Sequence, residues 1–312
     1  MFTKFLHKIY DTHHSIYNYI LKMSFIQLTV AYIIAMLILL CTFKHAHRHM
    51  IKYIEKTSSS TESFSKLAEN NDTFKTYYND NIFDKFYISV YDDLFNNKNK
   101  NIFEINILKK NTYLNDNSLI LDIGSGTGHH VNLLNKQGYS TTGIDKCNNM
   151  VVKAKSLYPN LDLRVGDATN SMLFEEYFFS HITCFYFTVY NIKNKSIFFQ
   201  NCYKWLAPGG YFIIHLVDKY KLNSTYSEVY DTLHKGDFKY ESKFNTISTN
   251  VMEHEEKFTF TNNNIRINKN TLYMESQADI ITMIKDQGFI MHAKIDMRKC
   301  NYNGQYIYIF KK

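Results

Sequence analysis

Residues 118–128, Ser118-Leu-Ile-Leu-Asp122-Ile-Gly124-Ser-Gly126-Thr-Gly128, join an apolar run to a glycine-rich turn, and a helical pattern follows as far as Gly138. The order predicts a strand, a loop and a helix. Glycines let the loop backbone approach a ligand closely, and the first helical turn supplies unpaired N–H groups. Dinucleotide-binding proteins space their glycines as Gly-x-Gly-x-x-Gly at this place. Here the spacing is Gly-x-Gly-x-Gly, with an aspartate two residues before the first glycine.

The stretch LDIGSGTG, residues 121–128, resembles motif I of the class I S-adenosylmethionine-dependent methyltransferases. In that family the next strand ends in an acidic residue that holds the ribose hydroxyls of the cofactor. Here the expected strand Tyr139–Ile144 is followed by Asp145. A carboxylate at this place can accept two hydrogen bonds from a diol, as in dinucleotide sites. The resemblance therefore implies that Asp145 binds the ribose.

Two landmarks for the adenine follow in the family's order. A helix is expected from Asn148 to Leu157, and Met150 stands where the family packs an apolar residue on adenine. The next expected strand, Leu161–Val165, leads into Gly166-Asp167-Ala168, which resembles the family's Gly-Asp-Ala. The resemblance implies that Asp167 receives the adenine amino group.

The pattern continues with a strand at His181–Phe187, a helix ending at Trp205, and a strand at Tyr211–Val217 after a Leu-x-Pro-Gly-Gly turn. The resemblance covers about residues 85–217 and implies S-adenosylmethionine as the cofactor. It also implies a Rossmann-like α/β fold, with a mostly parallel seven-stranded sheet and an antiparallel final hairpin. Generic turns of an unrelated doubly wound protein are the alternative. The residues implied to bind the cofactor are Tyr91, Asp122, Gly124, Ser125, Gly126, Gly128, Asp145, Met150, Asp167, Ala168, Phe185 and Tyr186.

Upstream, the segment Tyr91-Asp92-Asp93-Leu94-Phe95 resembles the Tyr-Asp-x-Leu segment with which many small-molecule methyltransferases cover their cofactor. Tyr91 is expected to lie over the methionine end of the cofactor, with an ordinary packed aromatic as the alternative. The chain departs from the family at Ser180-His181, where an acidic residue often precedes the fourth strand. That position is at the start of the strand, away from the ligand, so activity should not depend on it.

After Asp218 the pattern changes to short alternating segments. Residues 238–244, 250–260 and 265–274 are expected to form three strands of a small antiparallel lid, at about 219–275, inserted after the fifth strand of the sheet. A helix at 277–287 and strands at 289–297 and 305–310 should close the main sheet. The lid favours a small-molecule acceptor held between lid and cofactor. A simple sheet extension or a dimer surface is the alternative.

Methyl transfer from a sulfonium needs an in-line nucleophile, so proximity and orientation supply much of the acceleration. A general base is needed only when the acceptor must lose a proton. His215 is the first candidate because a neutral imidazole can accept a proton near pH 7, and Tyr190 is the second. A histidine in a strand is also commonly a packed, hydrogen-bonded residue. The Asn/Asp-Pro-Pro-Tyr signature of exocyclic-amine and glutamine methyltransferases is missing, which argues against those substrates.

The N-terminal part contains 21 consecutive uncharged residues between Lys22 and Lys44. A helix of this length spans the hydrocarbon core of a bilayer. A transmembrane helix is therefore predicted at about 23–43, in an anchor of residues 1–56, before a linker at 57–80 and a methyltransferase domain at 81–312. The slight excess of Lys and Arg after the helix favours a single-pass protein with its catalytic domain in the cytosol. A cleaved signal peptide and a buried core helix are the alternatives.

Charge and cysteine content narrow the function further. Of the net charge of +7, residues 1–56 carry +5, so the expected domain lacks the basic footprint of a nucleic-acid binder. The five cysteines include no Cys-x-x-Cys pair, so neither a disulfide framework nor a zinc site is expected. The alternating His45, His47 and His49 fit an interfacial collar better than a metal site. The abundance of Asn, Ile and Lys resembles AT-rich coding, as in a parasite or a large DNA virus.

The sequence therefore predicts an S-adenosylmethionine-dependent methyltransferase that acts on a small or lipid-like acceptor at a membrane surface. One alternative is a protein or nucleic-acid methyltransferase that uses the anchor only for placement. The other is a non-catalytic S-adenosylmethionine-binding scaffold on a membrane. The intact aspartates and glycines of the cofactor motifs argue against this second alternative.

Overall fold

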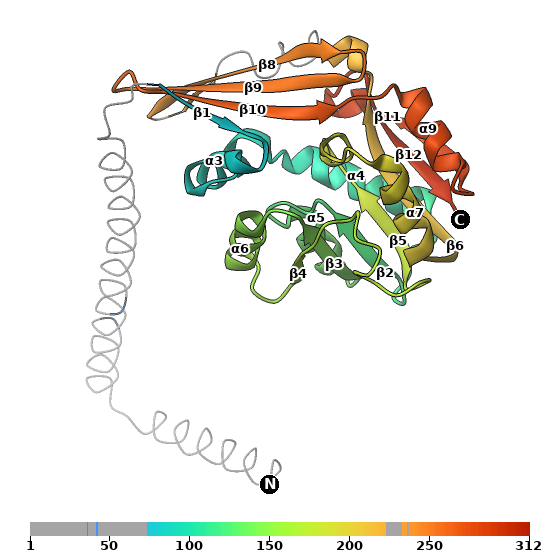
Figure 1. The fold of residues 1–312 in the computed structure, drawn as a ribbon. Helices are drawn as coiled ribbons and strands as arrows, with labels where there is room; N and C mark the ends of the chain where they lie inside the picture. The colour runs from blue at the N-terminus through green and yellow to red at the C-terminus, as the bar shows by residue number, and fades with distance from the viewer. Residues whose placement is uncertain (1–35, 37–41, 43–73, 223–232, 236) are drawn as a thin grey trace, which may run out of the picture. The chain divides into compact units, whose positions relative to one another are not determined.

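The computed structural model describes Met36, Thr42 and residues 74–222, 233–235 and 237–312 (Figure 1). Residues 72–312 form one unit, and residues 1–71 form another. The predicted transmembrane segment at 23–43 lies outside the described residues except for Met36 and Thr42, which are helical. Within the described ranges, no helix is long and apolar enough to cross a membrane. The sheets, the helices that cover them and the candidate site all belong to the unit of residues 72–312.

The larger of two sheets has seven strands, in the order β11-β12-β6-β5-β2-β3-β4. Strand β12 runs antiparallel to both of its neighbours, and the pairs among β6, β5, β2, β3 and β4 are parallel. This is the Rossmann-like sheet with a reversed last strand that the sequence predicts, so this part of the predicted fold class is confirmed. The bounds are β2 Leu119–Ile123, β3 Ser140–Asp145, β4 Asp162–Val165, β5 Phe179–Cys184, β6 Leu206–Val217, β11 Ile290–Asp296 and β12 Gln305–Lys311.

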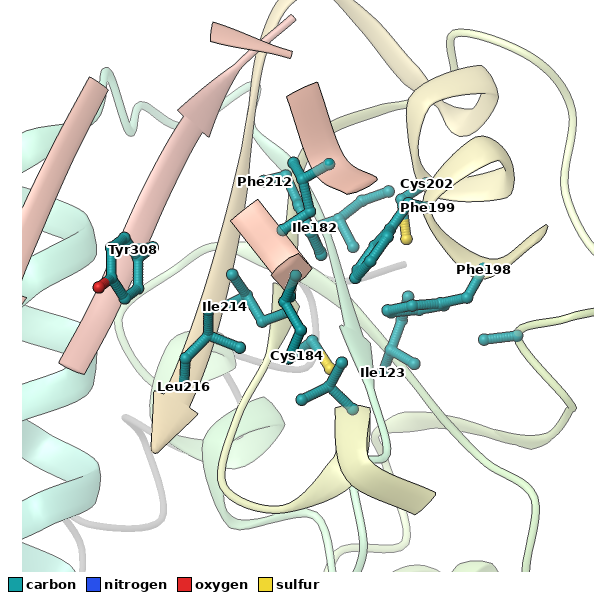
Figure 2. Packing of buried hydrophobic residues seen from close by; sticks show 14 of the residues in the cluster. Ile123, Ile182, Cys184, Phe198, Phe199, Cys202, Phe212, Ile214, Leu216 and Tyr308 are labelled. Carbon is teal, nitrogen blue, oxygen red and sulfur yellow. The ribbon is translucent and has the colours of Figure 1, made fainter. Parts of the chain in front are cut away.

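Apolar residues on both faces of the central strands explain why helices cover the sheet on both sides. On β6, Phe212 and Ile214 belong to the core beneath α7 and α9, while Tyr211 and Ile213 belong to the core beneath α4 and α5. Figure 2 shows the first of these cores, where Phe198, Phe199 and Cys202 of α7 pack on β5 and β6. The helices are α4 Lys98–Asn111, α5 His129–Asn135, α6 Asn148–Leu157, α7 Lys195–Trp205 and α9 Gln277–Lys285.

The smaller sheet, which we call the lid sheet, has the order β1-β10-β9-β8-β7. Its three long strands form an antiparallel meander, as the sequence predicts for the lid, and they extend as long arrows across one end of the unit in Figure 1. The prediction of a linker at 57–80 was wrong for the residues of β1, which form a strand. It pairs in parallel with β10, a partner nearly two hundred residues away that local pattern cannot reveal. The bounds are β1 Phe74–Tyr78, β7 Leu233–Lys235, β8 Phe238–Ser248, β9 Val251–Phe260 and β10 Ile265–Tyr273.

The helix α3, Lys85–Phe95, packs under the lid sheet, and we call it the cover helix. The N-cap Asp84 accepts a hydrogen bond from the backbone N–H of Tyr87, the third residue of the helix. Asp84 also forms a 2.7 Å ion pair with Arg266 of β10. The Arg266 guanidinium also donates to Asn268 and to the backbone oxygen of Ile82. A buried guanidinium with all of these partners fixes its neighbours firmly. The cover helix is therefore tied to the lid sheet.

Candidate active site

A cavity of about 960 Å³ opens at the carboxyl ends of β2, β3, β4 and β5, between these strand ends, the cover helix and the lid sheet. Ligands of doubly wound sheets bind at this edge. Two parts of its wall differ in origin. We call the part made by residues 122–127, 129–130, 145–150, 166–169 and Phe185 the cofactor half. We call the part made by Phe187, Thr188, residues 191–194, Ile197 and the lid-sheet residues Phe244, His254 and 270–273 the acceptor half.

The turn after β2 forms the floor of the cofactor half. Gly124 and Gly126 both take the left-handed backbone conformation, with φ of 69° and 53°. A Cβ at Gly124 would collide with the side chain of Thr188, so the position requires glycine. A Cβ at Gly126 would meet nothing within 4 Å, because this glycine faces open space. The turn thus offers bare backbone to a ligand, and Ser125 lines the same wall.

Asp145, at the end of β3, is held by the backbone on both of its oxygens. The Gly126 N–H donates to Oδ2 at 2.9 Å and the Cys147 N–H donates to Oδ1 at 2.8 Å. Each oxygen keeps a further lone pair for a ligand hydroxyl. Burial raises the pKa of Asp145, and the two N–H donors oppose the rise. This carboxylate lies where a ribose diol would complete its hydrogen bonds.

Two other aspartates line the cofactor half. Asp122 is buried and accepts a 2.7 Å hydrogen bond from the Thr183 hydroxyl, and burial raises its pKa. Asp167, after β4, is exposed and accepts from both the N–H and the hydroxyl of Thr169 through Oδ1. These bonds orient the Asp167 carboxylate at the cavity edge, where an exocyclic amine could donate to it.

Of the residues predicted to contact the cofactor, all but Gly128 line this cavity. Met150, Ala168 and Phe185 are buried and line the cavity. Gly128 does not line it. It is the N-cap of α5 with a φ of 83°, and a Cβ there would press on Tyr158 and Ala154. Its role is to begin the helix and to allow close packing, not to touch a ligand.

Tyr91 and Tyr186 line the cavity at the junction of its two halves. The Tyr91 ring lies 5.8 Å from the Tyr87 ring and 5.0 Å from the Phe95 ring, so it is both a packed aromatic and a wall residue. Asp92, its neighbour on the cover helix, contacts the Thr127 hydroxyl and lies 3.0 Å from His129 Nε2. The cover helix is therefore joined to the motif I turn as well as to the lid sheet.

The two predicted catalytic residues need a correction, because neither lines the cavity. Tyr190 is fully buried, and its hydroxyl accepts from the Val217 N–H at 2.8 Å. His215 is 1% exposed and burial lowers its pKa to about 4. A base must reach the proton that it removes, directly or through one water. We therefore assign neither side chain to proton transfer.

Several wall residues carry no motif and were missed by the sequence analysis. Lys100 is the clearest case, because it is 3% exposed and its Nζ contacts both oxygens of the fully buried Glu104 at 2.9–3.0 Å. His130 Nε2 lies 2.7 Å from the same carboxylate. Burial alone would raise the pKa of Glu104, but Lys100 and His130 hold it at about 2. The i, i+4 spacing of Lys100 and Glu104 was the available signal, and it is as common on solvated helix faces.

The acceptor half has a distinct chemistry. Among its described lining residues no carboxylate occurs, while one lysine, one histidine, three asparagines and two threonines do. Its aromatic walls include Phe187 and Phe244, whose rings stack at 5.8 Å, and His254, which stacks on Phe244 at 4.5 Å. Burial lowers the pKa of His254, so its ring is neutral near pH 7. The wall therefore offers aromatic faces, neutral donors and a cation.

Residues 121–214 match the family model of the methyltransferase domain. The phosphoethanolamine N-methyltransferase of Plasmodium falciparum (isolate 3D7) is 32% identical over 156 residues, which cover 47% of this chain and 58% of that enzyme. The match thus spans less than two thirds of that relative.

Solved structures show the same fold at low identity. The CcbJ methyltransferase of Streptomyces caelestis has a TM-score of 0.60 at 14% identity, over 75% of this chain and 98% of that one. The S-adenosylmethionine-bound CalS10 of Micromonospora echinaspora, an amino pentose methyltransferase, has a TM-score of 0.54 at 16% identity, over 73% and 97%.

The sheet order and the glycine turn are those of the class I S-adenosylmethionine-dependent methyltransferase fold, and residues 121–214 match the methyltransferase family model. S-adenosylmethionine is the cofactor of this family. The cofactor half fits it, because the open backbone at Gly126 and the free lone pairs of Asp145 lie side by side.

Proposed function

We propose that the protein transfers a methyl group from S-adenosylmethionine to a small-molecule acceptor enclosed between the cofactor half and the lid sheet. The observation that carries the proposal is the continuity of one cavity, which joins the acceptor half to the motif I turn. Bound in the cofactor half, S-adenosylmethionine would supply an electrophilic methyl group on its sulfonium. The chain's own part is to bind, orient and enclose the acceptor, which is sufficient for a large acceleration.

The acceptor half supports a small amine that also bears an anionic group. Aromatic rings such as Phe187 and Phe244 suit an alkylammonium or the amine formed from it. Lys193 and the amide of Asn270 suit a phosphate or carboxylate at the other end, and the described lining residues of this half offer no carboxylate to repel it. The Plasmodium relative is named for phosphoethanolamine, which has both groups. We propose phosphoethanolamine or a close analogue as the acceptor to test first.

The predicted membrane segment gives the proposal a location. If residues 23–43 span a bilayer, the unit is held at a membrane surface, with the catalytic domain in the cytosol beside its cofactor. Extraction of the full-length protein from membranes at alkaline pH tests this directly. Release into the soluble fraction would contradict the anchor without touching the enzymatic proposal.

The enzymatic proposal is tested with full-length protein and radiolabelled S-adenosylmethionine, offered phosphoethanolamine, ethanolamine, a lipid extract, a protein fraction or RNA. We expect label in a small-molecule product, with phosphoethanolamine preferred to ethanolamine. Label in protein or RNA alone would favour the alternative of a macromolecular methyltransferase. Binding of S-adenosylmethionine without transfer to any fraction would favour a non-catalytic scaffold and contradict the proposal.

A further inference from the structure

Tyr186 has an unusual backbone for a bulky residue. Its φ is 54°, in the left-handed region that residues with a Cβ rarely occupy, and it lies two residues after the end of β5. Residues held in such conformations cluster at functional sites, because the surrounding structure must compensate for the strain. The turn it makes separates Phe185 of the cofactor half from Phe187 of the acceptor half. Any change at Tyr186 would therefore move one half of the cavity relative to the other.

His215 compensates for this strain from the neighbouring strand. Strands β5 and β6 pair in parallel, and this brings the buried His215 ring beneath the turn. The Tyr186 N–H donates to His215 Nδ1 at 3.2 Å. Only a neutral imidazole can accept this bond, and burial keeps the ring neutral by lowering its pKa to about 4.

The Tyr186 side chain is held as well. Lys100 Nζ lies 5.4 Å from the centre of its ring, and Phe187 and Phe95 lie at 5.0 and 6.3 Å. Lys100 is itself fixed by Glu104, whose Oε1 is 3.8 Å from His215 Nδ1. One buried group of charges and dipoles thus contacts the tyrosine on both its backbone and its ring.

We propose that His215 is a positioning residue, which holds Tyr186 in the left-handed conformation and thereby aligns the acceptor half with the cofactor half. It acts through Tyr186 and touches neither ligand, which explains a polar, neutral histidine in a strand of the core. The kinetic part of this inference rests on the proposed function. The structural part, that His215 holds the Tyr186 amide, does not.

The test compares two substitutions of His215 in the full-length protein. In His215→Asn the amide oxygen can replace Nδ1 as acceptor, whereas His215→Leu keeps the bulk and removes the acceptor. We expect His215→Leu to lower kcat about ten-fold, as for the loss of one buried hydrogen bond, with the Kd for S-adenosylmethionine changed less than about three-fold. His215→Asn should recover most of the kcat. His181→Leu is the matched control, since it removes another buried strand histidine whose hydrogen-bond partners, Thr112 and Ser180, do not line the cavity.

A double-mutant cycle with Tyr186→Gly separates positioning from general destabilisation. Glycine adopts positive φ without strain, so His215→Leu should cost less than about three-fold in the Tyr186→Gly background. Equal losses in both backgrounds, or a loss from His181→Leu as large as that from His215→Leu, would overturn the proposal.

Hydrogen–deuterium exchange of the peptide 185–190 provides the readout that needs no turnover. Faster exchange at the Tyr186 amide in His215→Leu, but not in His215→Asn, is expected whether or not the acceptor is known. Unchanged exchange in both variants would refute the positioning contact. Absence of methyl transfer by the unmodified protein would instead refute the proposed function.

Discussion

The two halves of the cavity are built by different means. The cofactor half consists of strand ends and turns that are each local in sequence, such as the glycine turn after β2 and Asp145 after β3. The acceptor half depends on pairings between distant segments, because the lid strands contact the short turn η2, Thr188–Asn191, and Asp84, the N-cap of the cover helix. A binding site can thus combine a part that a short motif specifies with a part that only the assembled fold creates.

The tie between the lid sheet and the cover helix should be the most sensitive part of this arrangement. Replacing the largely buried Arg266 by Leu removes the donor to Asp84 Oδ2 and to the carbonyl of the buried Ile82. We expect the free energy of unfolding to fall by about 3 kcal/mol, measured by chemical denaturation. The control Lys243→Leu breaks the largely exposed pair with Glu255 on the same sheet and should cost less than about 1 kcal/mol. Equal losses of unfolding free energy in the two variants would show that the Arg266–Asp84 pair stabilises the fold no more than the control pair does.

The cofactor half should respond to a single local change. In Asp145→Ala the Gly126 and Cys147 N–H groups lose their acceptor, together with the ligand hydroxyls that the carboxylate would hold. We expect affinity for S-adenosylmethionine to fall by about 1–3 kcal/mol, or roughly ten- to hundred-fold, by calorimetry. Asp162→Ala, at an exposed carboxylate that pairs with Arg164 on β4, should leave the Kd unchanged. An unaltered Kd in Asp145→Ala would contradict the assignment of Asp145 to the ribose hydroxyls of S-adenosylmethionine.

Acid should weaken the large sheet through its buried histidines. Burial lowers the pKa of His181 to about 4, below the 6.5 of an unfolded histidine. As pH falls from about 6.5 to 4, the unfolded chain binds a proton at this site and the folded chain does not, so stability decreases over that window. We expect His181→Asn to remove about 2 kcal/mol of the stability difference between pH 7 and pH 5. The exposed His292→Asn is the control, and an identical pH dependence in both variants would contradict the assignment.

The acceptor half should show the smallest effect, because Lys193 is exposed and the interactions of an exposed charge are weakened by water. Lys193→Met should raise KM for phosphoethanolamine about ten-fold while leaving KM for ethanolamine nearly unchanged, since only the first has the phosphate. Lys204→Met changes another exposed lysine, which does not line the cavity, and should alter neither value. An equal rise in KM for both acceptors in Lys193→Met would show that the lysine does not bind the phosphate.

The sequence was sufficient for the Rossmann-like sheet because each of its strands carries its own pattern. Strands β2, β6 and β12 contain apolar runs, turns with glycine, proline or polar residues separate the strands, and the order of the family landmarks gives their topology. Strand β5 shows the limit of this reading. The pattern predicts a strand through Phe187, whereas the structure ends it at Cys184, because Tyr186 turns into the left-handed region and a short helix follows.

The parts that only the tertiary structure decided are those where contacts override local character. β1 lies in a segment that was predicted to be a polar linker. It forms a strand because it pairs with β10 at the edge of the lid sheet. The i, i+4 spacing of Lys100 and Glu104 is also typical of an exposed pair on a helix. In the structure both residues are buried, because His130 and Tyr186 pack around them. His215 reads as a candidate base, and the fold places it beneath the cavity instead. The sequence by itself determined the sheet and the cofactor turn, since short-range periodicity and glycine chemistry encode them. The lid partner, the buried charge cluster and the role of His215 depend on which distant residues meet, which only the folded chain defines.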